Sequence, residues 1–252
     1  MNSVLRAQKM KLKFFTLFFT LLTVTNVAYS ISSFNLELGS AQNSYNQVKI
    51  DGENGTLFNL RPALNPSDYY RVSFIHKFKS PNGIRFLYAP LKFSGEKKFN
   101  KDIYFNGELF SANQKTEAQF QFNSYRATYF REIISQKTLL LRVGGTIKVR
   151  DAFIELKQSD RSKARKSVGI VPLVYAYSKY KFENNFTMTL DFDGLVAPQG
   201  RAFDVALMFG YYFNPTLQID VGYRLLEGGA DNEKVYNFSQ INYLFTAVQL
   251  NF

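Results

Sequence analysis

Apolar residues recur at every second position over several stretches of the chain, and this alternation limits the fold more than any other feature. In residues 186–193, Phe, Met, Leu and Phe alternate with Thr, Thr, Asp and Asp. The same period of two occurs in residues 139–150, 202–213 and 217–226. It is the side-chain period of a β-strand that has one apolar and one polar or small face. Phe, Tyr and Trp make up 17% of the chain, which also favours strands.

Tight turns and longer connections alternate between the predicted strands. Asn, Pro and Gly mark the tight turns, which are residues 80–83, 135–137, 183–185 and 214–216. The longer connections are residues 51–67, 96–115, 157–167 and 231–239, with 197–200 a shorter member of this set. The layout predicts about ten strands, centred near residues 40, 73, 88, 124, 145, 175, 191, 207, 222 and 246. The number lies between eight and twelve, since residues 51–67 and 96–115 contain short apolar segments that could pair.

The first thirty residues have the pattern of a secretory signal peptide. Four positive charges without an acidic residue precede an apolar and threonine run, residues 14–27, which ends in Ala28-Tyr29-Ser30. A membrane anchor is the alternative, but the run is shorter than the roughly 20 residues that a helical span needs. Cleavage after Ser30 would lower the net charge from +11 to +7. An exported chain seldom meets nucleic acid, so no nucleic-acid partner is expected. The predicted organisation is a signal peptide, 1–30, and one domain, 31–252.

These features together predict an all-β, antiparallel up-and-down barrel that spans the outer membrane of a Gram-negative cell. No stretch after the leader has about 18 unbroken apolar residues, which excludes a transmembrane helix. An even strand number and short turns on the side of both termini are typical of such barrels. The last strand alternates Val248, Leu250 and Phe252, which resembles the signal read by the barrel assembly machinery. A soluble barrel is the rival, but the polar faces have few large apolar groups to fill a core.

With the apolar faces toward lipid, charges of both signs face the lumen. Charges facing lipid instead would cost about 2–4 kcal/mol each at mid-depth. The predicted lumen network comprises Arg142, Lys148, Arg150, Asp191, Asp193, Asp204, Asp220 and Arg224, with Lys179 and Lys181 on the same face. Ten strands enclose a narrow lumen. The expected function is therefore a structural barrel or a narrow solute channel.

Arg126 does not fit this assignment of faces, because it has the same parity as the apolar residues Phe120 and Phe130. A bulge or a position near the membrane interface would explain it.

An enzyme that modifies lipids or lipopolysaccharide is the alternative function. The chain has no cysteine and one histidine, so no metal site and no cofactor are expected. His76 has the parity of the lipid face, which leaves the rim carboxylates Glu227 and Asp231 as candidate acids beside Asn232. Outer-membrane lipids and lipopolysaccharide are the expected partners. The basic residues that could contact lipopolysaccharide phosphates, or form a solvated loop, are Arg161, Lys163, Arg165 and Lys166.

One block resembles a group of uncharacterised Gram-negative outer-membrane proteins. It runs from Gly222 to Asn232 and contains the run Arg-Leu-Leu-Glu-Gly-Gly-Ala-Asp-Asn. Similar blocks occur at residues 85–91, 122–126, 148–152 and 190–200, so that together the blocks span most of the mature chain. The resemblance implies an outer-membrane barrel and supplies no activity. Physically, Gly228 and Gly229 permit positive φ, which predicts a shaped loop at the outward rim.

Overall fold

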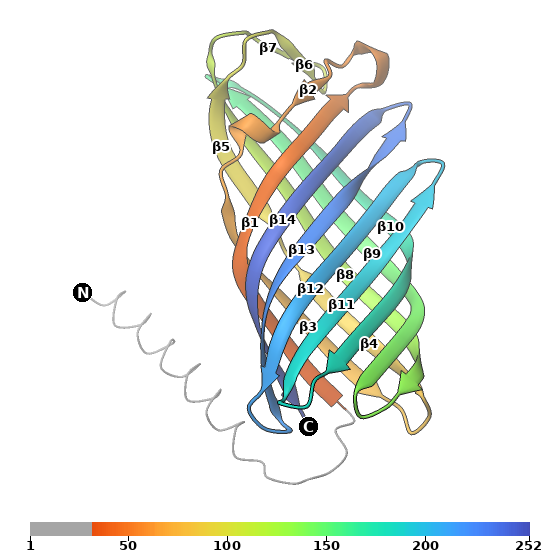
Figure 1. Ribbon diagram of the computed structural model, residues 1–252. Coiled ribbons are helices and arrows are strands. Elements are labelled where there is room, and N and C mark those ends of the chain that lie inside the picture. The colour runs from red at the N-terminus through yellow and green to blue at the C-terminus, as the bar shows by residue number, and fades with distance from the viewer. Residues whose placement is uncertain (1–31) are drawn as a thin grey trace, which may run out of the picture. The chain divides into compact units, whose positions relative to one another are not determined.

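Long antiparallel strands close into a barrel, because the last strand pairs with the first (Figure 1). The computed structural model describes residues 32–252, so the predicted signal peptide, 1–30, lies outside the described residues. The closing pair is in register from Ser33–Asn251 to Ile50–Val235, with one bulge between Asn43 and Tyr45. Closure leaves no free sheet edge along this seam, as a barrel in lipid requires.

The wall contains ten strands in sequence order, which confirms the predicted up-and-down barrel. Two segments, β4 and β5, count as one strand because both pair with β8 and Pro90, which has no N–H, separates them. The wall elements are β1 (Ser32–Ile50), β3 (Ser67–Lys77), β4 (Asn82–Ala89) with β5 (Lys92–Lys98), β8 (Lys115–Ser135), β9 (Leu139–Gln158), β10 (Arg161–Lys181), β11 (Phe186–Ala197), β12 (Gly200–Tyr212), β13 (Leu217–Asn232) and β14 (Val235–Asn251).

The connections at the two ends of the barrel differ. Tight turns lie at the lower end in Figure 1, where Ser32 and Phe252 also lie. At the upper end, one long connection contains η2 (Gly52–Asn54), β2 (Phe58–Asn59) and η3 (Arg61–Ala63). The other forms a small hairpin of β6 (Ile103–Phe105) and β7 (Glu108–Phe110). No helix among the described residues is long and apolar enough to cross a membrane.

Two of the predicted long connections are wrong. Residues 157–167 are strand apart from a turn at Ser159 and Asp160, where Ser159 has a φ of 54°. Residues 231–239 are strand apart from the turn at Glu233 and Lys234. Both segments are rich in polar residues, and polar strands can extend beyond the lipid.

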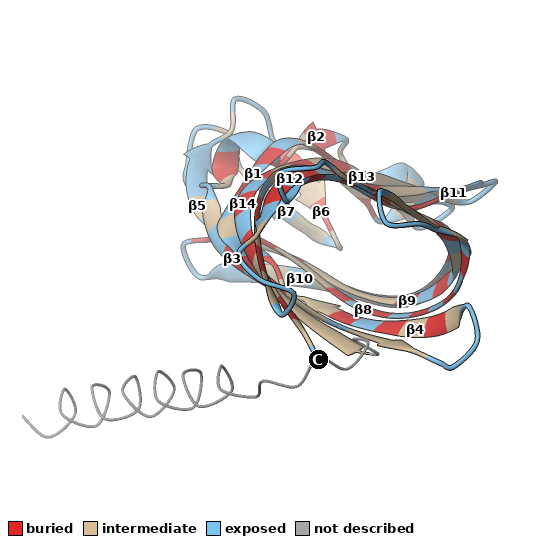
Figure 2. Cartoon of the chain, turned by 60° about the horizontal axis from the view of Figure 1, so that its bottom comes forward, coloured by how far each residue is buried: buried red, intermediate tan, exposed pale blue. Residues whose placement is uncertain are grey.

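Side chains alternate between the lumen and the outer surface along each wall strand, as Figure 2 shows by burial. On β9, Arg142, Thr146 and Lys148 are buried, whereas Val143 and Ile147 between them are exposed. The apolar face therefore points outward, in the predicted orientation. Exposed apolar side chains occur on every wall strand, among them Leu38, Phe74, Phe86, Tyr129, Ile147, Ile170, Leu190, Leu207, Tyr223 and Leu244.

Aromatic and polar side chains border this apolar outer surface. At the lower end the Tyr211 ring lies 5.0 Å from that of Phe186 and 5.1 Å from that of Phe213, a girdle typical of a membrane interface. Higher up, polar residues of several strands hydrogen-bond or pair with one another on the outward face. We call this set the outer polar belt: Tyr45, Asn123, Asp151, Lys166, Arg201 and Glu227. The lipid-facing band lies between the girdle and the belt.

The two long upper connections pack on the inner wall through apolar side chains. Leu60 before η3, Phe105 of β6 and Phe110 of β7 are buried in one cluster with wall residues such as Phe120. Phe120 and Phe130 therefore face inward together with Arg126, and the only irregularity between β8 and β9 lies farther along, at Glu132 and Ile134. The bulge proposed at Arg126 is wrong, because the alternating apolar residues of β8 line the lumen.

Candidate functional site

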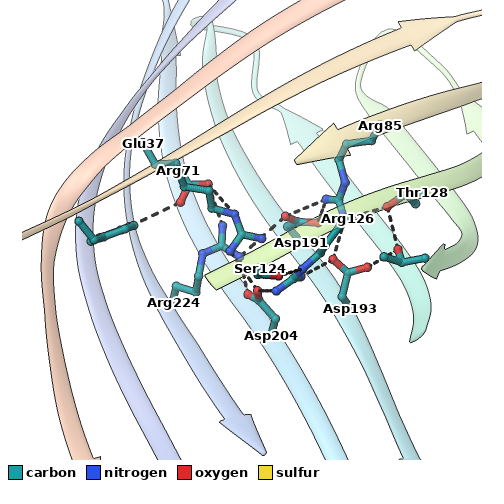
Figure 3. A network of polar contacts seen from close by, with 12 residues as sticks. Glu37, Arg71, Arg85, Ser124, Arg126, Thr128, Asp191, Asp193, Asp204 and Arg224 are labelled. Carbon is teal, nitrogen blue, oxygen red and sulfur yellow. Dashed lines mark hydrogen bonds and ion pairs between the residues drawn. The ribbon is translucent and has the colours of Figure 1, made fainter. Parts of the chain in front are cut away.

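Four arginines and four carboxylates meet in the middle of the lumen (Figure 3). We call this set the ion-pair layer. The arginines come from β3, β4, β8 and β13, and the carboxylates from β1, β11 and β12, so seven wall strands contribute. Its members are Glu37, Arg71, Arg85, Arg126, Asp191, Asp193, Asp204 and Arg224.

Arg126 joins the two halves of the layer. Its side chain is only 1% exposed, and its guanidinium donates to Asp193 at 2.8 Å and to Asp204 at 2.5 Å. Its Nε donates to Ser124 Oγ at 3.0 Å. A guanidinium holds its donors in a fixed plane, so it connects two carboxylates on neighbouring strands where a lysine would offer only a point charge.

Arg85 completes the half formed by β11. It donates to Asp191 at 2.9 Å and to Asp193 at 2.6 Å, and its guanidinium carbon lies 4.3 Å from the centre of the Tyr175 ring. Asp193 also accepts a hydrogen bond from Thr146 Oγ1 at 2.6 Å. Each buried charge of this half therefore has partners of opposite sign, the arrangement in which a buried ion pair is tolerated.

The other half of the layer consists of Arg224 and Arg71, which contact Asp204 and Glu37. Arg224 donates to Asp204 Oδ1 at 2.6 Å and to Glu37 Oε1 at 2.8 Å. Arg71 donates to Asp204 Oδ2 at 3.0 Å and lies 4.0 Å from Glu37. Together with Arg126, these residues give Asp204 hydrogen bonds from three arginines. The layer as a whole contains four positive and four negative side chains, so its formal charges balance.

A small cavity borders the ion-pair layer. A cavity of about 50 Å³ is lined by Arg71, Arg85 and Asp191 together with residues of the lower lumen such as Lys179. The volume per molecule of liquid water is about 30 Å³, so the cavity has room for one or two waters. Within the layer itself, buried arginine and carboxylate side chains from seven strands contact one another across the lumen.

The structure brings together four of the eight residues predicted for the lumen network: Asp191, Asp193, Asp204 and Arg224. The other four face the lumen elsewhere. Arg142 pairs with Glu132 at 2.9 Å, and Asp220 accepts from Gln218 at 2.5 Å. Lys148 and Arg150 have no carboxylate within 4.0 Å among the described residues.

Sequence reasoning missed Glu37, Arg71, Arg85 and Arg126 as members of the layer. On β3, β4 and β8 the inward face also carries large apolar or aromatic groups, so period-two hydrophobicity does not identify it. The signal that was available is register, because residues opposite one another on paired strands share a face. Arg126, for example, lies opposite Lys148, for which the alternation predicts a lumen position.

The rim carboxylates do not form a pair. Glu227 accepts hydrogen bonds from Tyr45 and, at 2.8 Å, from Arg201 Nη2, whereas Asp231 lies four residues farther along the same strand, roughly 13 Å away by strand rise. The Asn232 side chain accepts the backbone N–H groups of Lys234 and Val235 and so closes the turn.

The prediction of a loop at Gly228 and Gly229 is wrong. Both glycines lie inside β13, and neither has positive φ. A Cβ on Gly229 would lie 2.1 Å from the Asn237 carbonyl oxygen, and one on Gly228 would lie 2.4 Å from that of Arg201. These residues are glycine because neighbouring backbones approach closely.

The basic cluster predicted to contact lipopolysaccharide is divided between the two faces of β10. Lys166 alternates with the inward positions, points outward and lies 3.8 Å from Asp151 in the outer polar belt. Arg161, Lys163 and Arg165 have the parity of lumen residues, and Arg161 donates to the Leu109 carbonyl of β7. His76 lies on the outward face, where its Nδ1 is 2.9 Å from Ser32 Oγ. No group of His, Cys, Asp and Glu among the described residues could hold a metal ion.

A closed ten-stranded antiparallel wall, an apolar outer band and a charged interior define the fold of an outer-membrane β-barrel. No family model and no curated protein matches the chain. Solved barrels resemble it at the level of fold. The Escherichia coli outer-membrane protease OmpT has a TM-score of 0.54 at 10% identity, over 92% of this chain and 99% of OmpT. The attachment invasion locus protein Ail of Yersinia pestis has a TM-score of 0.41 at 10% identity, over 87% and 99%.

Proposed function

We propose that this chain is a structural, non-conducting β-barrel of the Gram-negative outer membrane, with the ion-pair layer as its closure. The observation that carries the proposal is the burial of Arg126 between Asp193 and Asp204 in mid-lumen. A solute would have to break several charge-assisted hydrogen bonds at once, and leaving a buried charge without its partner costs about 3–5 kcal/mol. The layer thus serves as a plug that also ties seven strands together.

Conductance of the refolded protein in a planar lipid bilayer tests the closure. We expect no discrete steps from the wild-type protein, and steps from Arg224→Ala, because that substitution removes a guanidinium that fills the lumen. Arg131→Ala is the matched control, since Arg131 is exposed on the outer face of β8. Folding of each variant is verified by its resistance to unfolding in detergent at room temperature. Regular steps from the wild type whose ion selectivity changes in Asp193→Asn would overturn the proposal and favour a selective channel.

The alternative of a lipid-modifying enzyme would require a free acid or base at the rim. Glu227 is engaged by Arg201 and Tyr45 and lies far from Asp231. No observation therefore favours this alternative over the structural barrel. Masses of lipid A and phospholipids from cells with and without the protein test it directly, and we expect identical spectra.

A further inference from the structure

The barrel wall is incomplete between β10 and β11. The two strands pair only from Val174–Gly194 to Lys181–Thr187, although β10 begins at Arg161 and β11 continues to Ala197. The other edges are paired throughout, β10 with β9 and β11 with β12. Figure 1 shows the β11–β12 hairpin and the upper part of β10 diverging. The hydrogen-bonded wall is thus open above Val174 and Gly194, and we call this part the lateral gap.

A cavity of about 330 Å³ lies at the lateral gap. Residues from both edges of the gap line it, including Gly169 and Val171 of β10 and Leu195 of β11. Small residues of the neighbouring strands line the cavity and leave room for it. They include Ala197, Ala202, Gly228 and Ala230. A cavity of this size with mostly apolar walls suits an alkyl chain.

The lower part of the gap lies against lipid rather than water. On β10, Ile170 and Val174 are 73% and 53% exposed and point outward, below Val168, which lies opposite Asp151 of the outer polar belt. On β11, Val196 is exposed and lies opposite Arg201, so the gap extends upward to the belt. Isolated apolar side chains this exposed at the border of the lipid-facing band place the gap where lipid chains reach it. Entry to the cavity is therefore lateral.

Two cations without carboxylate partners face the same cavity. Lys148 is only 2% exposed, and its Nζ lies 4.7 Å from the centre of the Phe122 ring. Arg150 donates to Ser167 Oγ at 3.2 Å, and its Nε has no partner. Among the described residues neither has a carboxylate within 4.0 Å, whereas every arginine of the ion-pair layer has one. The carboxylate that also lines the cavity, Glu227, is paired with Arg201. The inner end of the cavity therefore favours an anion.

We propose that the cavity binds an anionic single-chain amphiphile, of the fatty-acid type, taken laterally from the membrane. Its alkyl chain lies along the apolar lining at the lateral gap, and its carboxylate or other anionic head contacts Lys148 and Arg150. This binding compensates the buried charge of Lys148 and the half-buried charge of Arg150 without opening the ion-pair layer. It is independent of conduction, so the bilayer experiment above and the binding experiment below can fail separately.

The absence of tryptophan from the chain allows a single-residue reporter. Phe122→Trp places the indole beside Lys148, and Phe213→Trp places a control indole in the lower aromatic girdle. In zwitterionic detergent micelles, a fatty acid brominated on its chain should quench the first reporter saturably and the second only in proportion to its amount in the micelle. The brominated alcohol of equal length should bind at least about tenfold more weakly, because it lacks the charge.

Charge variants in the Phe122→Trp background complete the test. Lys148→Gln and Arg150→Gln should each weaken saturation by the fatty acid about tenfold or more. Lys179→Gln, a lumen lysine below the layer, should leave it unchanged. Equal affinity for acid and alcohol, quenching that ignores both substitutions, or identical curves from the two reporters would overturn the proposal. Inhibition of quenching by inorganic phosphate alone would show a site for a free anion and would also overturn it. Circular dichroism verifies that each variant is folded.

Discussion

Arg126 is the side chain that links the two halves of the ion-pair layer. It is almost fully buried, and it holds Asp193 and Asp204 on adjacent strands. Arg126→Met removes the positive charge between two buried carboxylates, so we expect the free energy of unfolding to fall by about 3–5 kcal/mol. Denaturant titration of the protein in phospholipid vesicles measures the change. Arg131→Met, on the exposed face of the same strand, should change it by no more than about 0.5 kcal/mol. Equal losses in the two variants would contradict a structural role for the layer.

Two neighbouring glycines of β9 offer a test of backbone approach at single-residue resolution. A Cβ on Gly144 would lie 2.1 Å from the Tyr129 carbonyl oxygen, whereas one on Gly145 would meet nothing within 4 Å. We expect Gly144→Ala to destabilise the barrel by about 1–3 kcal/mol, as overpacking does, and Gly145→Ala to be neutral or slightly stabilising. The same vesicle titration compares them. A larger loss in Gly145→Ala would show that β8 and β9 pack differently.

At the scale of the strands, the sequence predicts the positions of the wall strands within the lipid. It does not predict how far those strands extend beyond the lipid. Alternation and turn residues locate all ten strands, because a lipid-facing surface and a polar lumen impose period two. Above the outer polar belt both faces of a strand can be polar, as in residues 157–167, so the pattern there no longer differs from that of a loop. Half of the ion-pair layer is predictable, because Asp191, Asp193, Asp204 and Arg224 lie on strands with clear period-two alternation. The other half, such as Arg85 and Arg126, requires the strand register.

The β6–β7 hairpin is held to the barrel by buried aromatic side chains. Phe105 is fully buried in the upper apolar cluster, whereas Leu109 on the same hairpin is 43% exposed. Phe105→Ala should therefore cost about 3–5 kcal/mol of local packing and detach the hairpin, while the wall keeps its own ladder. We expect proteases to cleave within residues 99–114 of Phe105→Ala and to spare both the wild type and Leu109→Ala. Mass spectrometry of the fragments locates the cleavage. Cleavage in the wall strands would contradict independent packing of the hairpin.

For the whole molecule, the lumen is divided by height and by side. The ion-pair layer closes the middle, the upper connections pack on the wall formed by strands such as β1 and β8, and the lateral cavity lies at the edges of β10 and β11. A closed middle and an opening in the side are complementary, since a ligand that enters from the lipid has no need of a continuous pore. The two proposals together therefore predict a molecule that contacts the membrane and does not pass solutes across it.

The position of the lipid-facing band can be tested with lysine substitutions at two depths. Leu207 on β12 is exposed and lies opposite Leu190 and Tyr223, both apolar and exposed, so its side chain is surrounded by lipid-facing neighbours. Gln42 of β1 is exposed near the bulge that precedes Tyr45 of the outer polar belt. Leu207→Lys should lower the free energy of unfolding in phospholipid vesicles by about 2–4 kcal/mol, and Gln42→Lys by about 0–1 kcal/mol, because the cost of a lysine falls from the bilayer midplane to its interface. In detergent micelles the difference should shrink, since thin and adaptable micelles let the ammonium reach water. Equal costs at the two positions in vesicles would move the outer polar belt into the lipid or Leu207 out of it. Either result would displace the lateral gap from the depth at which lipid chains can enter it.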